Sequence, residues 1–312
     1  MRVVVFGATG DQGSAQVRAL ARAGHDPVAV SRRPQALAID GRRIATFAAD
    51  FADLPSLAAA LQGADAAFLN LPSTSFQVAE PLVAAVGFLA RAAADSPSIR
   101  SLVFNTSLPV PQDKLGFAAQ DARHEMRRLL FASGTPTVSI EPVVFLDNWL
   151  KGWAWPAIEQ HGKLVYAHKP DLAVSWICHD DLAALMLAAL ARPELAGRSF
   201  PVGGAETVCL PELAEKLGRA WNRPLGWESL GIDDFCQRMR QVFEGRSSLE
   251  ADRLIAELHR IYTWYNNAPE QPFKVDMRPV LRELPVHLTT IEEWARRQRL
   301  PDAAGATAMA HA

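Results

Sequence analysis

Cysteine, tyrosine and net charge are scarce in this chain of 312 residues. The three cysteines, Cys178, Cys209 and Cys236, include no CxxC pair, which excludes zinc-ribbon spacing and argues against a disulfide framework. A formal net charge of −2 gives no field that would attract nucleic acid or anionic lipid. No apolar stretch approaches the roughly 20 residues of a bilayer span, and the chain opens without a secretion signal. We therefore expect a cytoplasmic protein with no nucleic-acid or membrane partner.

Hydrophobic residues make up 49% of the chain, enough for a large core, and their pattern alternates in the first half. Up to about residue 150, short β-rich runs alternate with longer stretches of helical periodicity. The expected strands are residues 3–6, 27–31, 43–48, 66–70, 101–105 and 137–141. The expected helices between them are residues 12–23, 54–62, 76–94 and 117–133. This alternation predicts an α/β fold with a doubly wound parallel sheet, covered by helices on both faces.

The second half of the chain is less regular, and all eight tryptophans lie in it or at its start, from Trp149 onward. A run at residues 173–177, followed by an apolar helix, looks like one more strand and helix that return to the sheet. Further helical periodicity appears at residues 211–221, 233–243, 249–265 and 291–299. We expect residues 1–150, together with 173–192, to form one domain. Residues 151–303 would form a smaller, mostly helical lobe, and residues 304–312 a flexible tail.

A glycine-rich turn follows the first predicted strand. Gly7, Gly10 and Gly13 have GxxGxxG spacing between this strand and the first helix. The first glycine permits a sharp turn, the second lets backbone N–H groups approach a diphosphate, and the third permits close packing of helix on strand. The turn therefore predicts a Rossmann dinucleotide site. The residues between the glycines that we assign to the same site are Ala8, Thr9, Asp11 and Gln12.

The end of the second predicted strand indicates which dinucleotide is preferred. An acidic residue there would accept from the ribose 2′-hydroxyl of NAD(H), but this chain has Arg32 and Arg33. A guanidinium holds a 2′-phosphate through charge-assisted hydrogen bonds, so the pair favours NADP(H). The alternative is a solvated basic pair that closes the strand. Asp50, after the third strand, is a candidate acceptor for the adenine amine or, equally, an ordinary turn or N-cap residue.

Several motifs together resemble the NmrA-like family, a branch of the atypical short-chain dehydrogenase/reductases. They are GATGDQG at 7–13, RRP at 32–34, ADF at 49–51, NTS at 105–107, RHE at 123–125 and EPVVFLDN at 141–148. The resemblance covers about residues 1–300. It implies a Rossmann domain, a smaller C-terminal lobe and an NADP(H) site along the ends of the strands. The residues that it adds to this site are Phe51, Leu71, Pro72, Arg123 and Pro142.

The YxxxK pair of ordinary short-chain dehydrogenases is absent. Its tyrosine exchanges a proton with the substrate and its lysine lowers the tyrosine pKa and holds the nicotinamide ribose. None of Tyr166, Tyr262 and Tyr265 is followed four residues later by lysine. In the helix where family reductases carry a lysine, this chain has Arg123, which can donate to a ribose but does not relay protons at neutral pH.

Three residues remain as catalytic candidates: Arg123, Thr106 and His124. Thr106 follows the fifth strand, where its hydroxyl would orient a substrate carbonyl or simply end the strand. His124, like His161 and His168 further along, is a candidate proton donor, and the alternative for each is an ordinary surface or capped histidine.

Aromatic residues after the sixth strand suggest a substrate pocket. Their flat apolar faces suit an aromatic or quinonoid ligand, with Asn148 as a polar anchor, and the alternative is a hydrophobic seam between lobes. The candidate pocket residues are Phe145, Asn148, Trp149, Trp153 and Tyr166. The triplet His179–Asp180–Asp181 matches a helix start better than a metal site, so we expect no metal.

Two functions remain open at this point. The first is an NADPH-dependent reductase of a small quinone, enone or related aromatic carbonyl substrate. The second is a non-enzymatic NADP(H)-binding sensor that acts through a protein partner. A direct DNA-binding regulator is poorly supported, because no helix-turn-helix pattern stands out. The sequence leaves both a monomer and a homodimer open.

Overall fold

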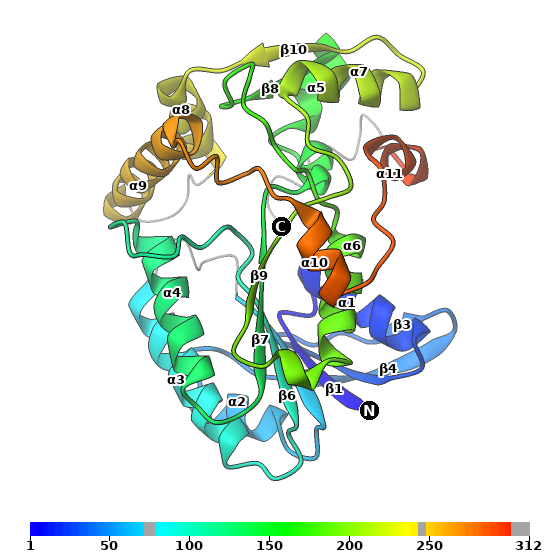
Figure 1. The fold of residues 1–312 in the computed structure, drawn as a ribbon, viewed down its shortest axis with the longest axis vertical. Helices are drawn as coiled ribbons and strands as arrows, with labels where there is room; N and C mark the ends of the chain where they lie inside the picture. The colour runs from blue at the N-terminus through cyan, green and yellow to red at the C-terminus, as the bar shows by residue number, and fades with distance from the viewer. Residues whose placement is uncertain (72–78, 243–247, 301–312) are drawn as a thin grey trace. The chain divides into compact units, whose positions relative to one another are not determined.

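The computed structural model describes residues 1–71, 79–242 and 248–300 and divides into two compact units (Figure 1). Unit 1 comprises Met1–Pro142, His179–Val202 and Arg278–His287. Unit 2 comprises Val143–Cys178, Gly203–Met277 and the chain from Leu288 onward. Within the described ranges, no helix combines the length and apolar character needed to cross a bilayer.

Unit 1 is built on a sheet that has eight strands among the described residues, in the order β3-β4-β2-β1-β5-β6-β7-β9. The strands are β1 (Arg2–Phe6), β2 (Asp26–Ser31), β3 (Leu37–Ile39), β4 (Arg42–Ala48), β5 (Ala66–Asn70), β6 (Ser101–Asn105), β7 (Thr137–Pro142) and β9 (Ser199–Val202). All neighbours pair in parallel except β3 with β4. The strand order reverses at β1, and a ligand of such a sheet binds at the carboxyl ends of the strands at this point.

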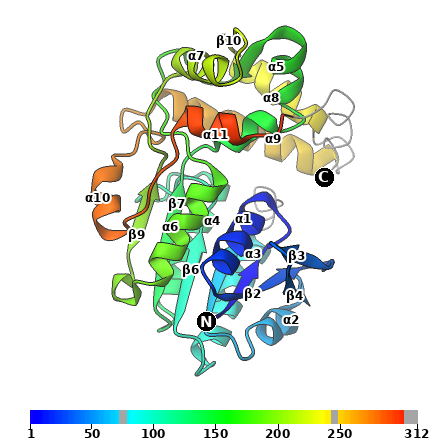
Figure 2. The same ribbon diagram turned by 90° about the vertical axis from the view of Figure 1, so that its right-hand side faces the viewer.

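Helices cover both faces of this sheet, as Figures 1 and 2 show. On one face lie α1 (Asp11–Arg22) and α6 (His179–Leu190), which pack against each other. On the other lie α2 (Leu54–Ala60), α3 (Ala79–Ala94) and α4 (Ala118–Phe131). Two shorter helices of this part of the chain are η3 (Pro193–Leu195) and α10 (Met277–Glu283). Because β5 and β6 are covered on both faces, every one of their residues is buried. The doubly wound α/β fold predicted from the sequence is confirmed.

The six predicted strands of the first half are all present, and two edge elements were missed. Strand β3 forms a hairpin with β4 through Asp40 and Gly41, which both have positive φ (49° and 79°). An Asp-Gly pair between two strands is the sequence signal for such a turn. The strand expected at residues 173–177 is wrong: Val174 and Ile177 make only isolated bridges, and the strand that joins the sheet is β9. The predicted helix 76–94 corresponds to α3, which the structure describes over Ala79–Ala94. Residues 76–78 lie outside the described residues.

Unit 2 is mostly helical in the part of the chain that the structure describes. Its elements are η2 (Leu146–Leu150), α5 (Trp155–His161), β8 (Lys163–Tyr166), α7 (Leu210–Ala220), β10 (Gly226–Ser229), α8 (Ile232–Val242), α9 (Ser248–Asn267) and α11 (Ile291–Arg297). The four helices predicted after residue 210 correspond to α7, α8, α9 and α11, and only Phe243, the last residue of the predicted 233–243, lies outside the described ranges. Strands β8 and β10 pair in parallel as a small second sheet.

Candidate dinucleotide site

The glycine turn between β1 and α1 leaves no room for side chains at two of its positions. Gly7 has a φ of 71°, in the left-handed region that favours glycine. A Cβ on Gly13 would lie 2.3 Å from the carbonyl oxygen of Gly7 and 2.8 Å from the Cα of Ala8. The third glycine therefore lets the helix pack directly against the turn, as the motif spacing predicts.

The amino end of α1 is open to an anion. Gly10 is its N-cap and offers no side chain to the first-turn N–H groups, and the first helical bond runs from the Ser14 N–H to the Gly10 carbonyl at 2.8 Å. Uncapped N–H groups and the positive end of the helix dipole favour a phosphate at this point. Gly10 and Thr9 are exposed, whereas Ala8 is buried behind them. This cradle fits the diphosphate of a dinucleotide.

Arg32 and Arg33 follow β2 and are both exposed. Within the described part of the chain neither guanidinium forms an ion pair, so both charges are open to a ligand. The Oγ of Ser31, just before them, is buried and has no hydrogen-bond partner among the described residues. The carboxyl end of β2 is where the adenosine ribose lies in a Rossmann domain. This end thus combines free positive charge with an unused hydroxyl.

Asp50 and Phe51 shape the loop after β4. One carboxylate oxygen of Asp50 accepts from the Ala52 N–H at 3.0 Å, so Asp50 makes a turn. The N-cap of α2 is instead Asp53. Phe51 is half-buried and packs edge-on against Phe6 with ring centroids 6.3 Å apart. Asp50 therefore stabilises this turn, which is one of its two predicted roles. Its second carboxylate oxygen has no hydrogen bond to a described residue, and contact with the adenine amine stays a prediction.

The end of β6 is held by Arg123. This arginine is fully buried, and its Nε donates to the carbonyl oxygen of Thr106 at 2.7 Å while its Nη1 donates to Ala119 at 2.8 Å. The Thr106 hydroxyl is also fully buried and donates to the carbonyl of Leu108 at 2.7 Å. Both side chains thus serve the main chain of this turn. Their assignment to catalysis or to cofactor contact stays a prediction.

The remaining predicted positions lie around the same strand ends. Half-buried His124 has its Nε2 3.1 Å from the carbonyl oxygen of Gln112, and its Nδ1 is buried without a partner in the described residues. Leu71 directly follows β5, and Pro142 ends β7. Pro72 lies outside the described residues. The assigned residues after these strands lie at the same end of the sheet, the carboxyl ends of the strands, because β1, β2, β4, β5, β6 and β7 are parallel.

A set of buried carboxamides at this edge was missed in the sequence. Asn70 and Asn105 are the last residues of β5 and β6, and Gln16 lies on the buried face of α1. All three are at most 4% exposed, and they bond to one another and to Gln12. The signal that points to them is an asparagine at the carboxyl end of each of two neighbouring apolar strands.

The candidate substrate-pocket residues lie in unit 2, where two of them contact Tyr166. Trp149, fully buried, and Trp153, half-buried, have ring centroids 5.4 and 5.6 Å from that of Tyr166. Burial raises the pKa of Tyr166 to about 12, and its hydroxyl lies 3.1 Å from that of Tyr262. Phe145 is buried, and Asn148 is half-buried. Trp149, Trp153 and Tyr166 thus belong to one aromatic cluster, and the role of all five candidates in binding a substrate stays a prediction.

His168 belongs to the same cluster. Its ring centroid lies 4.4 Å from that of Tyr166 and 5.6 Å from that of Trp176. It is 1% exposed, and neither ring nitrogen has a hydrogen-bond partner among the described residues. Burial lowers the pKa of His168 to about 3. His168 is therefore neutral at physiological pH. His161, at the end of α5, is instead exposed.

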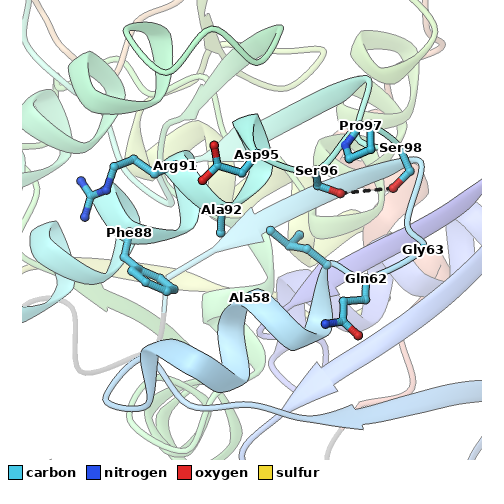
Figure 3. A pocket seen from close by; sticks show the side chains of 11 residues that line it. Ala58, Gln62, Gly63, Phe88, Arg91, Ala92, Asp95, Ser96, Pro97 and Ser98 are labelled. Carbon is cyan, nitrogen blue, oxygen red and sulfur yellow. Dashed lines mark hydrogen bonds between the residues drawn. The ribbon is translucent and has the colours of Figure 1, made fainter.

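A separate pocket of about 640 Å³ lies between α2 and α3 (Figure 3). Phe88 and Arg91 of α3 line it, together with Gln62 after α2 and the Ser96–Ser98 segment before β6. These loops precede β5 and β6, so the pocket lies at the amino ends of the strands, opposite the glycine turn. It is not part of the dinucleotide site. Among the described residues, no group of three or more His, Cys, Asp or Glu is arranged to hold a metal ion.

Comparison with known proteins agrees with this geometry. The model of the NmrA-like family matches residues 1–295. The chain belongs to the NmrA-like family. The resemblance that its motifs suggested is thereby confirmed for nearly the whole length of the chain.

Two relatives of the chain are reductases by name. A (4-alkanoyl-5-oxo-2,5-dihydrofuran-3-yl)methyl phosphate reductase of Streptomyces griseus is 32% identical over 234 residues, which are 74% of this chain and 78% of the relative. An NAD(P)H azoreductase of Xenophilus azovorans is 28% identical over 240 residues, 76% of this chain and 80% of the relative.

Solved structures share the fold of this NmrA-like chain. An NADPH-dependent quinone oxidoreductase of Escherichia coli, complexed with NADPH, is 22% identical with a TM-score of 0.70, and the match covers 95% of this chain and 98% of that one. NmrA, a negative transcriptional regulator in complex with NADP, is 18% identical with a TM-score of 0.73, over 95% and 94% of the two chains. The fold is thus common to an enzyme and a regulator.

Proposed function

We propose that the chain is a cytoplasmic, NADPH-dependent reductase of a small quinone, enone or related aromatic carbonyl compound. The observation that carries this proposal is the glycine cradle at the carboxyl end of β1, where a Cβ on Gly13 would overlap the Gly7 carbonyl. A glycine turn with no space for a Cβ at Gly13, next to an uncapped helix end, suits a diphosphate. The family membership and the two related reductases support the same function.

The chain's own residues have distinct tasks in this proposal. The backbone of Gly7 to Gly13 binds the diphosphate, and Arg32 or Arg33 binds the 2′-phosphate of the adenosine, which distinguishes NADPH from NADH. NADPH, when bound, supplies the hydride for such a reduction. The protein then needs to orient the acceptor and exclude water from it.

An acceptor with a conjugated carbonyl group fits one of the two related reductases and the aromatic cluster. The substrate in the Streptomyces enzyme's name is an oxo-dihydrofuran that carries an alkanoyl group, and the E. coli structure is a quinone oxidoreductase by name. Planar acceptors of this kind stack on accessible aromatic faces, such as that of half-buried Trp153 in unit 2. We assign the acceptor to Phe145, Asn148, Trp149, Trp153 and Tyr166.

Protonation of the reduced acceptor requires a donor other than a YxxxK tyrosine. Arg123 holds two main-chain carbonyl groups and has no accessible surface. His124 is half-buried at the same end of the sheet, and histidine is the side chain that most often transfers protons in catalysis. In the proposal, His124 or solvent supplies the proton.

The first test is cofactor selectivity. Of the variants Arg32→Ala and Arg33→Ala, the one that removes the arginine in contact with the 2′-phosphate should lower NADPH affinity by about tenfold, while NADH affinity stays unchanged. The matched control is Arg100→Ala, at an exposed arginine that lies at the amino ends of the strands. It should change neither the NADPH affinity nor the NADH affinity. Wild-type protein should also oxidise NADPH with members of a quinone and enone panel. Absence of saturable binding of either dinucleotide would overturn the proposal.

A second candidate function is a dinucleotide sensor that acts through a protein partner. It is favoured by the use of both Arg123 and the Thr106 hydroxyl for main-chain bonds, which leaves neither for chemistry in this conformation. A sensor should bind NADPH and NADP⁺ with different affinities and recruit its partner in one state only. NADPH oxidation by any acceptor of the panel would decide for the reductase.

A further inference from the structure

A continuous set of side-chain amides connects the glycine turn to the end of β6. Gln16 and Asn70 exchange two hydrogen bonds of 2.8 and 2.7 Å. Asn105 donates through Nδ2 to Asn70 Oδ1 at 2.7 Å and to Gln12 Oε1 at 2.6 Å. Ser107 Oγ also donates to Gln12 Oε1, at 3.2 Å. Asn105 is fully buried, so its bonds lie in a region of low dielectric where geometry is strongly fixed.

Two main-chain groups fix the direction of every bond in this network. The N–H of Ser107 can only donate, and it donates to Asn105 Oδ1 at 2.9 Å. The carbonyl of Phe6 can only accept, and it accepts from Asn70 Nδ2 at 2.8 Å. Asn105 must therefore direct its Nδ2 toward Asn70 and Gln12, and Asn70 must direct its Oδ1 toward Asn105. No amide in the network can be flipped without leaving a buried group unpaired.

The consequence appears at Gln12, the second residue of α1. Its Oε1 accepts from both Asn105 and Ser107, so its Nε2 cannot face the network. Gln12 is half-buried, and its Nε2 donates to no described residue. The amide group therefore holds an oriented, unused N–H donor beside the uncapped end of α1.

The side of the turn on which Gln12 lies indicates its target. Strand β2, which ends at Arg32, is on one side of β1, while β5 and β6 are on the other. A dinucleotide in a Rossmann domain crosses the sheet at this reversal, with its adenosine over the β2 side. The contacts of Gln12 with Asn105 and Ser107 place it on the side of the nicotinamide half.

We propose that Asn105 is a positioning residue that orients Gln12 to donate, through Nε2, to an oxygen on the nicotinamide half of the dinucleotide. This inference rests on the proposed function, because it requires that NADPH binds. It assigns to Asn105 an effect on cofactor affinity without contact with the cofactor. Ser107, which has a left-handed φ of 63° and is tied to Asn105 and Gln12, strengthens the same orientation.

The test is a double-mutant cycle with two ligands, measured by calorimetry. Asn105→Leu and Gln12→Met preserve size and remove the amides. Each should weaken NADPH binding by about tenfold, the loss of one hydrogen bond to a charged or strongly polar oxygen. Binding of 2′,5′-ADP, which lacks the nicotinamide half, should change less than about twofold. In the Gln12→Met background, Asn105→Leu should cause no further loss, because its effect runs through Gln12.

Controls separate this inference from the proposed function and from misfolding. Gln62→Met, an exposed glutamine at the opposite edge, should leave both affinities unchanged. If Asn105→Leu does not fold, Ser107→Ala replaces it in the cycle. Its expected loss of NADPH affinity is smaller, about threefold, because Ser107 is only half-buried. If the wild type binds neither ligand, the proposed function fails. If the wild type binds both, and the variants retain NADPH affinity or lose it additively, only the role of Asn105 is overturned.

Discussion

The Nε of Arg123 lies 2.7 Å from the carbonyl oxygen of Thr106, and its Nη1 lies 2.8 Å from that of Ala119. One buried guanidinium thus joins the turn after β6 to the first turn of α4. The resemblance to the NmrA-like family assigned Arg123, in the helix where family reductases carry a lysine, to the cofactor site, and that assignment stays a prediction. In the structure its guanidinium binds the loop that carries Thr106 and Ser107, a task that a single ammonium performs less well.

The first prediction concerns the stability of this connection. Arg123→Met should lower the free energy of unfolding of unit 1 by about 3 kcal/mol, because the buried Thr106 carbonyl and the partly buried Ala119 carbonyl lose charge-assisted donors. Arg123→Lys should lie between wild type and Arg123→Met, since lysine keeps the charge but not the fork. Urea denaturation followed by circular dichroism, with hydrogen exchange to separate the two units, measures the effect.

Arg128→Ala on the same helix is the control for this prediction. Arg128 is 58% exposed and forms a surface ion pair with Glu125, so its removal should cost less than about 1 kcal/mol. Equal destabilisation by Arg123→Met and Arg128→Ala would show that the buried bonds to Thr106 and Ala119 contribute little.

The second prediction separates packing from ligand contact within the glycine turn. Gly13→Ala places a Cβ 2.3 Å from the Gly7 carbonyl oxygen, so the turn must shift and stability should fall by about 2 kcal/mol. Gly10 has a φ of −77°, and a Cβ there would lie 3.4 Å from the Gly7 oxygen, so Gly10→Ala should fold normally. Its methyl group would stand at the exposed mouth of the cradle and weaken NADPH binding. The two readouts are the melting temperature and the dissociation constant. A stable Gly13→Ala protein, or a Gly10→Ala protein with full affinity, would contradict the respective part.

The central strands could be predicted from the sequence because both their faces are buried. β5 and β6 begin and end at the predicted residues, since continuous apolar runs bounded by polar residues have few other interpretations. The edge strands β3 and β9 were missed because they have only three and four residues and mixed burial. Their pairing depends on partners distant in sequence, such as Ser139 of β7 with Ser199 of β9, which no local pattern shows.

The site could be predicted only where its residues act through local geometry. The glycine spacing is such a case, because strand, turn and helix are contiguous in the chain. The carboxamide network is not, since Gln16 meets Asn70 across 54 positions and Gln12 meets Asn105 across 93. For Tyr166, the sequence indicated an aromatic environment, but only the structure shows the buried hydroxyl pair with Tyr262 and the stacked His168.

The third prediction is an acid sensitivity of unit 2 that originates in His168. Burial holds the pKa of the folded histidine at about 3, whereas in the unfolded chain it is about 6.5. The unfolded state therefore binds the proton first, and stability falls as the pH drops from about 6.5 toward 3. The loss approaches about 1.4 kcal/mol per pH unit in that window. The neighbouring phenols of Tyr166 and Tyr262, whose pKa values are raised by burial, stay neutral throughout and do not compensate.

His168→Phe removes the titrating group and keeps an aromatic ring in the cluster. Tryptophan fluorescence reports on unit 2 alone, because all eight tryptophans belong to it. Between pH 7.5 and pH 5, the wild type should lose about 2 kcal/mol more unfolding free energy than His168→Phe, while other titrating groups cancel in the comparison. His161→Gln, at an exposed histidine of the same unit, should follow the wild type. Over this pH range the wild type and His168→Phe differ only through the protonation of His168 on unfolding. Equal losses of stability would therefore show that burial in this cluster does not lower the pKa of His168.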